Sequence, residues 1–529
     1  MCKMERFGNC DPETADQEYC IFHKPNKSEE EAREFWKKFL EKFKPRVEEI
    51  EVDGEKVKRL VFEKEVNARG FVFPEIPKVA IEYKDKKGNR WDQRFSFEYA
   101  VFKNDLRFSS SKFKGEFSFK EAIFEKYAGF KGCMFYKEIS FDNTYFKQGI
   151  RLNGSIFKEK CSFRRSCLGS SSLEDSFSIM AKTFERGVDF TNASFNSSLK
   201  CVKTVFKEKV TFERVKFNDE ITFMNAKFHG VTSFKGAIFY ESVKFIDGTI
   251  FSKLVSFDSA LFKQRVYFTR CVFGNANFEN STFEDSVRFE SVEFLNAAVF
   301  KGSLFKRIVY FEKTDFNGYL SFSNSIFQRG IQITKEHFKL PEAEAEARRI
   351  QRLSYEKEGK RDDADRMFVL ERRAYRKVLR HCAKEKYSNA KTLYQKFEAI
   401  MFLIYTYIST AIEIVLADWI SLYGTSWGRI ILNSFWVITV NAILYQALSR
   451  FSHTMILRIP IGTIYTNSTS GGISGLLNAL YYSLVTFTTL GYGDMHPTGW
   501  LKALSAIEAL TGAVFMALIV AVMARKWMR

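Results

Sequence analysis

Glycine and proline are scarce in this 529-residue chain, with 29 Gly and 8 Pro, which excludes collagen-like and Pro/Gly-rich disordered chains. No basic segment followed by a short apolar segment opens the sequence, so we expect no secretory signal. The nine cysteines therefore favour reduced thiols or metal ligands over a disulfide framework. The chain also lacks any nucleophile–base or phosphate-binding constellation, so we do not expect an enzyme.

Positive charge is in excess, with 81 Lys and Arg against 63 Asp and Glu, a net charge of +18. This balance favours a negatively charged partner surface. The basic run at 371–396 lies directly before the first apolar segment of the C-terminal quarter. Attraction to anionic lipid explains its charge more simply than nucleic acid does. We therefore expect a lipid bilayer as a partner and no nucleic acid.

Phenylalanine is abundant and unevenly placed, since 40 of the 57 Phe lie between residues 101 and 340. In this block the Phe positions advance by alternating steps of five and six, as in the series Phe206, Phe212, Phe217, Phe223, Phe228, Phe234, Phe239, Phe245. A small residue or a β-branched residue stands two positions before each Phe. Neither a helical period nor strict alternation fits this step, but short extended segments joined by turns do.

This pattern resembles the Phe-rich variant of the pentapeptide-repeat family. The resemblance implies a right-handed quadrilateral β-helix, with four faces per coil and about eleven coils over residues 95–340. Ser170–Ser172 interrupt the pattern, and we expect a bulge or lost register there. The block has no catalytic grouping, so a purely structural rod is the simplest interpretation; a rod that binds an unknown ligand or protein is the alternative.

The last quarter contains two long uncharged segments. Ile430–Ser449 is long enough to cross a bilayer, and Ala509–Ala524 forms the core of a second apolar helix that can begin near Trp500. Between them a shorter apolar segment ends in the letters T-F-T-T-L-G-Y-G-D. Two spans thus flank a short helix and a loop over residues 428–529; the resemblance of this loop to a channel filter implies a two-helix transmembrane pore domain with a re-entrant loop.

These letters closely resemble the selectivity filter of the potassium-channel pore family. The matching residues are Thr489, Leu490, Gly491, Tyr492 and Gly493, with Asp494 as the acid that usually follows. The resemblance implies that four identical chains turn filter carbonyls toward one axis, where dehydrated potassium ions bind. It also implies that Gly475–Thr488 is the pore helix and that Tyr492 packs against it. Gly491 and Gly493 suit this backbone because they lack Cβ.

The second span contains two candidate functional residues. Gly512 lies mid-span, where this family often has a gating hinge, although close helix packing explains a membrane glycine equally well. Glu508 is the acid within the span, and an intramembrane acid indicates function; near the outer end it can support the filter together with Asp494.

The segment 397–422 precedes these spans and is ambiguous. Its uncharged run Ala399–Ile412 is short for a span, and Glu413 follows it. Thr406, Ser409, Thr410 and Glu413 form a polar stripe at helical spacing. Because the basic residues at 371–396 and the C-terminal Arg525, Lys526 and Arg529 belong on the cytoplasmic side, we expect an interfacial helix like the slide helix of related channels, and not a third span.

The segment 341–396 is charged, rich in Ala and poor in helix breakers, which predicts two helices at 341–358 and 362–382. They can transmit motion from the repeats to the pore or act as a rigid spacer.

At the N-terminus, region 1–94 contains Cys2, Cys10, Cys20 and His23. Three thiolates and an imidazole form a closed tetrahedral zinc set, although the spacing fits no well-defined finger. A small zinc knuckle and reduced surface thiols are the two readings. After it we expect a helix at 28–43, a hairpin at 47–62 and a second hairpin around residues 87–88.

Together these features predict a tetrameric potassium-selective channel in the cell membrane, with the repeat domain, N-terminus and C-terminus cytoplasmic. The alternative is a membrane-anchored scaffold whose pore is non-conducting or weakly selective. An anchor has no need of Thr489, Tyr492 and both glycines in register, so the filter motif favours the channel.

Overall fold

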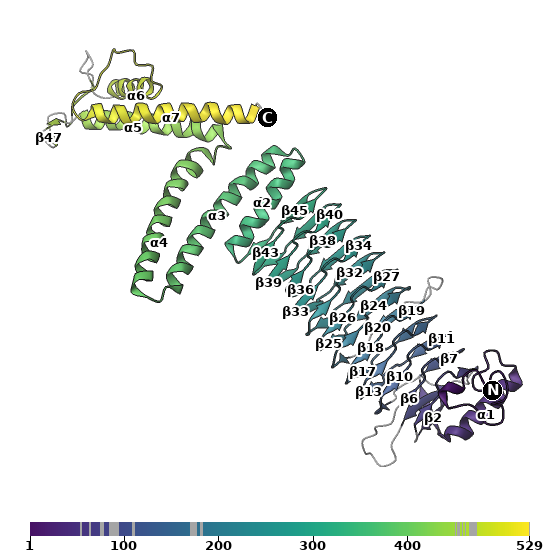
Figure 1. Cartoon of the computed structure of the whole chain (residues 1–529). Coiled ribbons are helices and arrows are strands. Elements are labelled where there is room, and N and C mark those ends of the chain that lie inside the picture. The colour runs from purple at the N-terminus through teal and green to yellow at the C-terminus, as the bar shows by residue number, and fades with distance from the viewer. Residues whose placement is uncertain are drawn as a thin grey trace. The chain divides into compact units, whose positions relative to one another are not determined.

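The computed structural model describes the chain from Met1 to Trp527, apart from residues 53–54, 63–64, 75–78, 84–94, 108–111, 170–176, 180–182, 450, 452–454, 457–458, 461 and 465–472. It divides into two compact units, Met1–Met367 and Phe368–Arg529 (Figure 1). Each unit is described by itself below.

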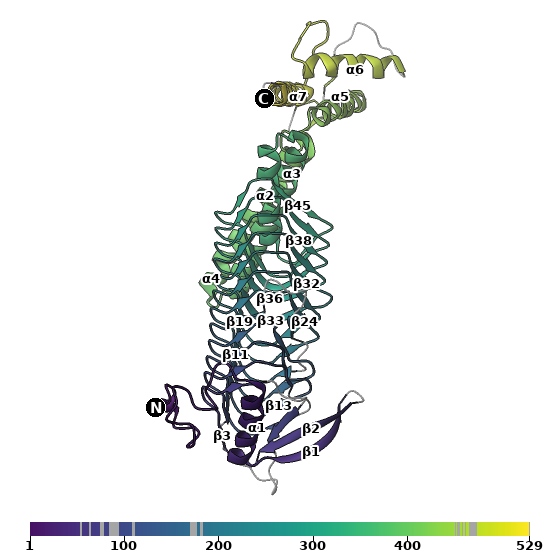
Figure 2. The same ribbon diagram turned by 90° about the vertical axis from the view of Figure 1, so that its right-hand side faces the viewer.

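The first unit is a β-solenoid of short parallel strands, one strand per coil on each face (Figures 1 and 2). One face is a 12-stranded sheet. Its strands are β4 (Val72–Phe73), β7 (Val101–Phe102), β11 (Ile123–Phe124), β15 (Tyr145–Phe146), β19 (Cys167–Leu168), β23 (Ser194–Phe195), β27 (Lys216–Phe217), β31 (Ile238–Phe239), β34 (Leu261–Phe262), β37 (Thr282–Phe283), β40 (Leu304–Phe305) and β44 (Ile326–Phe327). About ten turns separate β7 from β44, which confirms the predicted repeat solenoid.

The other faces follow the same rule of one strand above the next. An 11-stranded sheet runs from β8 (Leu106–Arg107) to β45 (Ile331–Thr334). The remaining two faces merge into one 20-stranded sheet, because β33 (Ile250–Ser256), β36 (Val272–Asn277) and β39 (Glu293–Val299) continue through the corner between them. The solenoid is therefore four-sided.

Stacked phenylalanine rings fill the interior. Phe239 lies on Phe262 with ring centroids 4.5 Å apart and planes 2° apart, and Phe251 lies on Phe273 at 5.3 Å and 6°. These separations are close to the strand spacing, so equivalent rings of successive coils follow one another in columns.

Buried hydroxyls explain the small residue two positions before many Phe. Ser281 and Ser303 each donate a hydrogen bond to a Phe carbonyl of the preceding coil, at 2.7 and 2.6 Å. A larger residue at these positions would displace the rings, which accounts for the Ala, Ser, Thr and Cys seen there.

Both ends of the solenoid are covered. Upstream of the predicted boundary at residue 95, β3 (Val66–Asn67) and β4 already form a coil, since they pair in parallel with β6 (Phe95–Ser96) and β7. The predicted helix is α1 (Glu29–Phe43), capped by Ser28 and Glu31, and the predicted hairpin is β1 (Arg46–Val52) and β2 (Glu55–Phe62), with β5 (Val79–Tyr83) beside β2. Figure 2 shows α1 and the hairpin at the purple end. The second hairpin at 87–88 and the interruption at Ser170–Ser172 lie outside the described residues.

At the other end, α2 (Pro341–Lys357) lies on the last coil. Its Ala343, Ala347 and Ile350 belong to the solenoid core, and the Gln351 amide donates to the Ile333 carbonyl at 3.1 Å. After Gly359 the chain continues as α3 (Arg361–Asn389), so the two predicted linker helices are present and the second is longer than expected.

The second unit is helical. After the end of α3 come α4 (Leu393–Glu413), the π-helical segment η2 (Ile414–Trp419), α5 (Trp427–Ser449), α6 (Ile473–Phe487) and α7 (Leu501–Trp527), with the small pair β47 (Met455–Ile456) and β48 (Ile459–Pro460). Among the described residues, three helical stretches are long and apolar enough to cross a membrane: 393–419, 427–449 and 501–527. The last two correspond to the expected spans; the first corresponds to the helix expected at 397–422 and continues past Glu413 through η2.

Candidate functional site

The segment that resembles a channel filter follows α6 directly. The end of α6 is tied to the next residues because the Thr489 and Leu490 amides donate to the carbonyls of Thr486 and Val485, both at 3.1 Å. Thr489, Gly491 and Gly493 have positive φ values of 56°, 58° and 77°. Alternation of the sign of φ turns successive carbonyls toward one side of the chain.

Of these three residues with positive φ, Thr489 is not a glycine. A β-branched residue in the left-handed region costs about 1–2 kcal/mol, and such strain concentrates at functional sites. Leu490 and Tyr492 are 60% and 68% exposed in the single chain, so Tyr492 is not packed away within its own subunit. Asp494 interacts with the Tyr481 hydroxyl of α6, which links the residue after the predicted filter to the helix before it.

A buried polar network holds α5, α6 and α7 together around Glu508. The Tyr445 hydroxyl of α5 donates to the Glu508 carboxylate at 2.7 Å, and Ser483 of α6 donates to its other oxygen. Ser505 lies 3.1 Å from the Tyr445 hydroxyl and 2.8 Å from that of Tyr482. Glu508 is 1% exposed, so the predicted filter-supporting acid lies behind the pore helix and connects it to both long helices.

Gly512 lies on α7 one turn beyond Glu508. A Cβ atom at this position would lie 1.8 Å from the Phe487 carbonyl oxygen at the end of α6, far inside van der Waals contact. Phe487 itself is buried and meets Phe515 edge to face at 5.9 Å. Of the two readings, close packing thus accounts for this glycine without a hinge.

A second charged cluster joins α3 to η2. Arg373 binds both carboxylate oxygens of Asp418 at 2.8 and 3.0 Å, and Arg376 binds the same group at 2.7 Å. Arg376 also donates to the Tyr423 hydroxyl. Asp418 was not among the residues predicted from the sequence, although an acid directly after the apolar run Ile414–Ala417 indicates that a basic side chain should pair with it.

The polar stripe of α4 faces the basic helix α3. Arg380 donates to the Thr410 hydroxyl at 3.1 Å, and Arg372 pairs with Glu413 at 3.1 Å. Further along, Lys386 pairs with Glu398 at 2.7 Å and also lies over the Phe402 ring. The two helices are therefore in side-chain contact along most of the length of α4.

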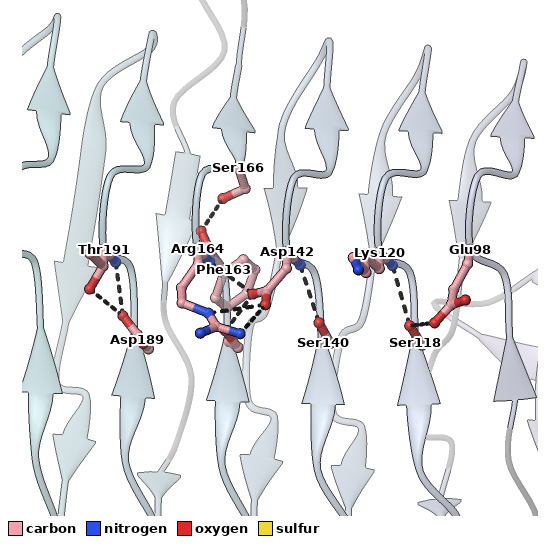
Figure 3. Close-up of polar contacts among 11 residues, drawn as sticks. Glu98, Ser118, Lys120, Ser140, Asp142, Phe163, Arg164, Ser166, Asp189 and Thr191 are labelled. Atoms are coloured by element: carbon pink, nitrogen blue, oxygen red, sulfur yellow. Dashed lines mark hydrogen bonds and ion pairs between the residues drawn. The ribbon is translucent and has the colours of Figure 1, made fainter.

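On one solenoid face a polar groove follows the ladder of β3, β6, β10 (Phe117–Ser118), β14 (Ile139–Ser140) and β18 (Cys161–Ser162). Figure 3 shows that its polar groups bind one another. Ser118 donates to Glu98 at 2.8 Å, and the Nη2 and Nε groups of Arg164 both donate to Oδ2 of Asp142, at 2.7 and 3.1 Å.

The same corner position carries a charge of alternating sign on successive coils, in the order Glu98, Lys120, Asp142 and Arg164. Opposite charges therefore follow one another along this row, and contacts such as Ser118 with Glu98 and Arg164 with Asp142 join neighbouring coils.

The four N-terminal metal-ligand candidates lie together. The ligand atoms of Cys2, Cys10, Cys20 and His23 are all within 4.8 Å of one another. Cys2, Cys20 and His23 are buried and Cys10 is half-buried. Burial lowers the pKa of the His23 imidazole to about 4 and raises the pKa of the Cys10 thiol to about 12.

Two family models match this chain, one in the solenoid and one in the C-terminal helical part. A family model described as "Ion channel" matches residues 452–529, and one described as "Pentapeptide repeats (9 copies)" matches residues 97–144, 246–293 and 289–331. No curated protein and no solved structure matches the chain significantly. The chain is thus a fusion of a pentapeptide-repeat solenoid with a C-terminal ion-channel domain.

Proposed function

We propose that four copies of this chain form a potassium-selective channel that passes potassium ions down their gradient. The observation that carries this proposal is the backbone of Thr489–Gly493, where φ is positive at every second residue directly after a short apolar helix. A row of carbonyls turned to one side can replace the water around a dehydrated cation.

The single chain supplies one quarter of such a cage, and two observations support assembly. Residues 489–493 are all exposed in the single chain, and irregular backbone at membrane depth is tolerated only where protein covers it or where it lines a water-filled pore. The Glu508 network and the contact of Gly512 with Phe487 hold each pore helix rigidly against its own subunit. Four preformed quarters can then meet around one axis.

We further propose that α4 lies on the cytoplasmic membrane surface and does not form a third span. If α4 crossed the bilayer, its partner α3 would carry Arg372, Arg380 and Lys386 into the hydrocarbon at a cost of several kcal/mol each. On the surface, the exposed apolar side chains of α4 enter the lipid while the basic helix stays near anionic headgroups. This topology also places the solenoid and Arg525 in the cytoplasm.

Selectivity is tested by recording from the purified protein in planar bilayers with potassium on one side and sodium on the other. The expected result is a reversal potential close to that of a potassium electrode. Gly491→Ala should abolish this selectivity, because a Cβ opposes the positive φ and alters the carbonyl row, while tetramers still form.

Leu490→Val is the matched control, since it changes the same loop but keeps the family pattern T-[V/I/L]-G-Y-G, and it should retain selectivity. Equal permeability of sodium and potassium in the wild type would contradict the proposal. So would the absence of current in wild-type tetramers, which would favour a non-conducting membrane anchor.

A further inference from the structure

The N-terminal segment before α1 is folded into a compact knuckle, residues 1–27, although it contains no regular element longer than the short turn Glu5–Phe7. Its buried side chains include the candidate ligands Cys20, which is fully buried, and His23, which is 1% exposed, beside the few apolar residues Phe7, Ile21 and Phe22. So small a segment has too little apolar core to hold its own shape, and such segments are usually held by a metal or a disulfide. No disulfide joins its three cysteines, so their sulfurs remain available as metal ligands together with His23.

We propose that Cys2, Cys10, Cys20 and Nδ1 of His23 bind one zinc ion, and that this site holds the knuckle as a cap on the open end of the solenoid. The three sulfurs lie 3.5, 3.7 and 3.0 Å from Nδ1 of His23. Tetrahedral zinc, with Zn–S near 2.3 Å and Zn–N near 2.0 Å, places sulfur and nitrogen ligands about 3.5 Å apart. The observed cluster already has this spacing.

Groups around the cluster suit a metal-bound thiolate set. Nε2 of His23 lies 3.3 Å from the Arg69 carbonyl, so a proton on Nε2 leaves the lone pair of Nδ1 for the ion. The Cys20 amide donates to the Cys2 sulfur at 3.3 Å, which stabilises a thiolate. Three thiolates and one Zn²⁺ leave one negative charge, and the Lys42 ammonium lies close by, 3.5 Å from the Cys10 carbonyl.

Zinc fits better than other ions because three sulfurs and one nitrogen in a closed tetrahedral set leave no position for water or substrate. Calcium and magnesium need oxygen ligands, which this cluster does not offer. The site is therefore structural.

The knuckle continues the solenoid's own hydrogen-bond ladder. In the solenoid, Val101 donates its amide to the Phe71 carbonyl of the coil above at 2.7 Å, and Val72 donates in the same way to Phe22 of the knuckle at 2.8 Å. The Phe22 ring stacks on Phe71 at 4.6 Å and 10°, as phenylalanines of successive coils do.

The knuckle also binds the first coil through side chains beside and within the cluster. The Asn9 amide donates to the Asn67 and Arg69 carbonyls at 3.2 and 3.0 Å, and His23 meets the same Arg69 carbonyl. A β-solenoid end otherwise exposes an unpaired strand edge, which invites association with other chains. Zinc in the knuckle thus protects the first coil.

The first experiment measures metal content of the full-length protein, purified under reducing conditions in detergent. We expect one zinc per chain in the wild type, and a loss of at least tenfold in Cys20→Ser and His23→Ala. His23→Cys should keep zinc, since it substitutes one ligand for another. Cys382→Ser, at an exposed cysteine outside the cluster, is the matched control and should also keep zinc.

Replacement of zinc by Co²⁺ gives a second readout. The d–d and thiolate charge-transfer absorption should indicate a tetrahedral S₃N site, and in His23→Cys it should change to that of an S₄ site. Wild-type protein without stoichiometric zinc or cobalt, or equal loss of zinc in Cys20→Ser and Cys382→Ser, would overturn the metal site.

The role as a cap is tested by hydrogen exchange. Removal of zinc by a chelator, or Cys20→Ser, should increase exchange of the Val72 amide, which donates to Phe22, by at least tenfold. The Leu261 amide in the middle of the solenoid donates to Ala237 and should exchange as before. Zinc binding without any effect on Val72 would overturn the cap.

Discussion

Gly512 shows how one missing side-chain atom positions the pore helix. The Phe487 carbonyl lies where a Cβ would be, so Gly512→Ala must push α6 away from α7. We expect fewer tetramers on size-exclusion chromatography, and a lower thermal midpoint that corresponds to a loss of about 1–3 kcal/mol of stability, as for other overpacked sites.

Gly428→Ala is the control, because an added Cβ at that position of α5 meets nothing within 4 Å. It should be neutral or slightly stabilising, by about 0.5–1 kcal/mol, since Ala favours helix over Gly. A Gly512→Ala protein that assembles normally but gates differently would instead support the hinge.

At the scale of elements, the contact of α3 with η2 depends on Asp418. Asp418→Asn leaves Arg373 and Arg376 without an opposite charge, and breaking a buried pair of this kind costs about 3 kcal/mol. We expect a lower thermal midpoint and faster hydrogen exchange in α3. Glu398→Gln removes the exposed pair with Lys386 and should change stability by less than about 1 kcal/mol. Equal effects of the two substitutions would contradict the assigned role.

For the helix at 393–419, length and composition favour a membrane span, whereas its contacts favour a position on the membrane surface. Its composition alone allows a span, as for α5 and α7. Its contacts with the arginines of α3 favour the membrane surface. The polar stripe read from the sequence was correct, but its partner is another helix of the same chain rather than water.

For the whole molecule, the division into two units predicts that filter chemistry does not need the solenoid. Deletion of residues 1–360 removes the coils together with α2, whose apolar face would otherwise lose its cover. Because Glu508, Gly512 and the filter all lie in the second unit, the shortened protein should keep the reversal potential of the full chain in the same bilayer recordings.

Deletion of residues 1–340 alone leaves α2 with an exposed apolar face, and we expect that version to aggregate more readily. Loss of ion selectivity in the 1–360 deletion, with tetramers intact, would show that the solenoid takes part in forming the filter.

The sequence by itself determined the repeat, the solenoid class, and the short apolar helix followed by a loop that resembles a channel filter, because each follows from local periodicity or from consecutive residues. Phe spacing reports which side chains point inward on a coil, and T-L-G-Y-G is contiguous. The same holds for the four candidate ligands, although only folding brings Cys2 and His23 within 3.5 Å.

The tertiary structure alone decided what the buried polar groups do. Tyr445, Ser483 and Glu508 are far apart in sequence and meet only when three helices pack, and Asp418 meets Arg376 only across the α3–α4 connection. The close contact of Gly512 with Phe487 likewise depends on an atom of another helix, while the gating hinge stays a prediction. Low dielectric surroundings make such long-range pairs strong, and no local pattern encodes them.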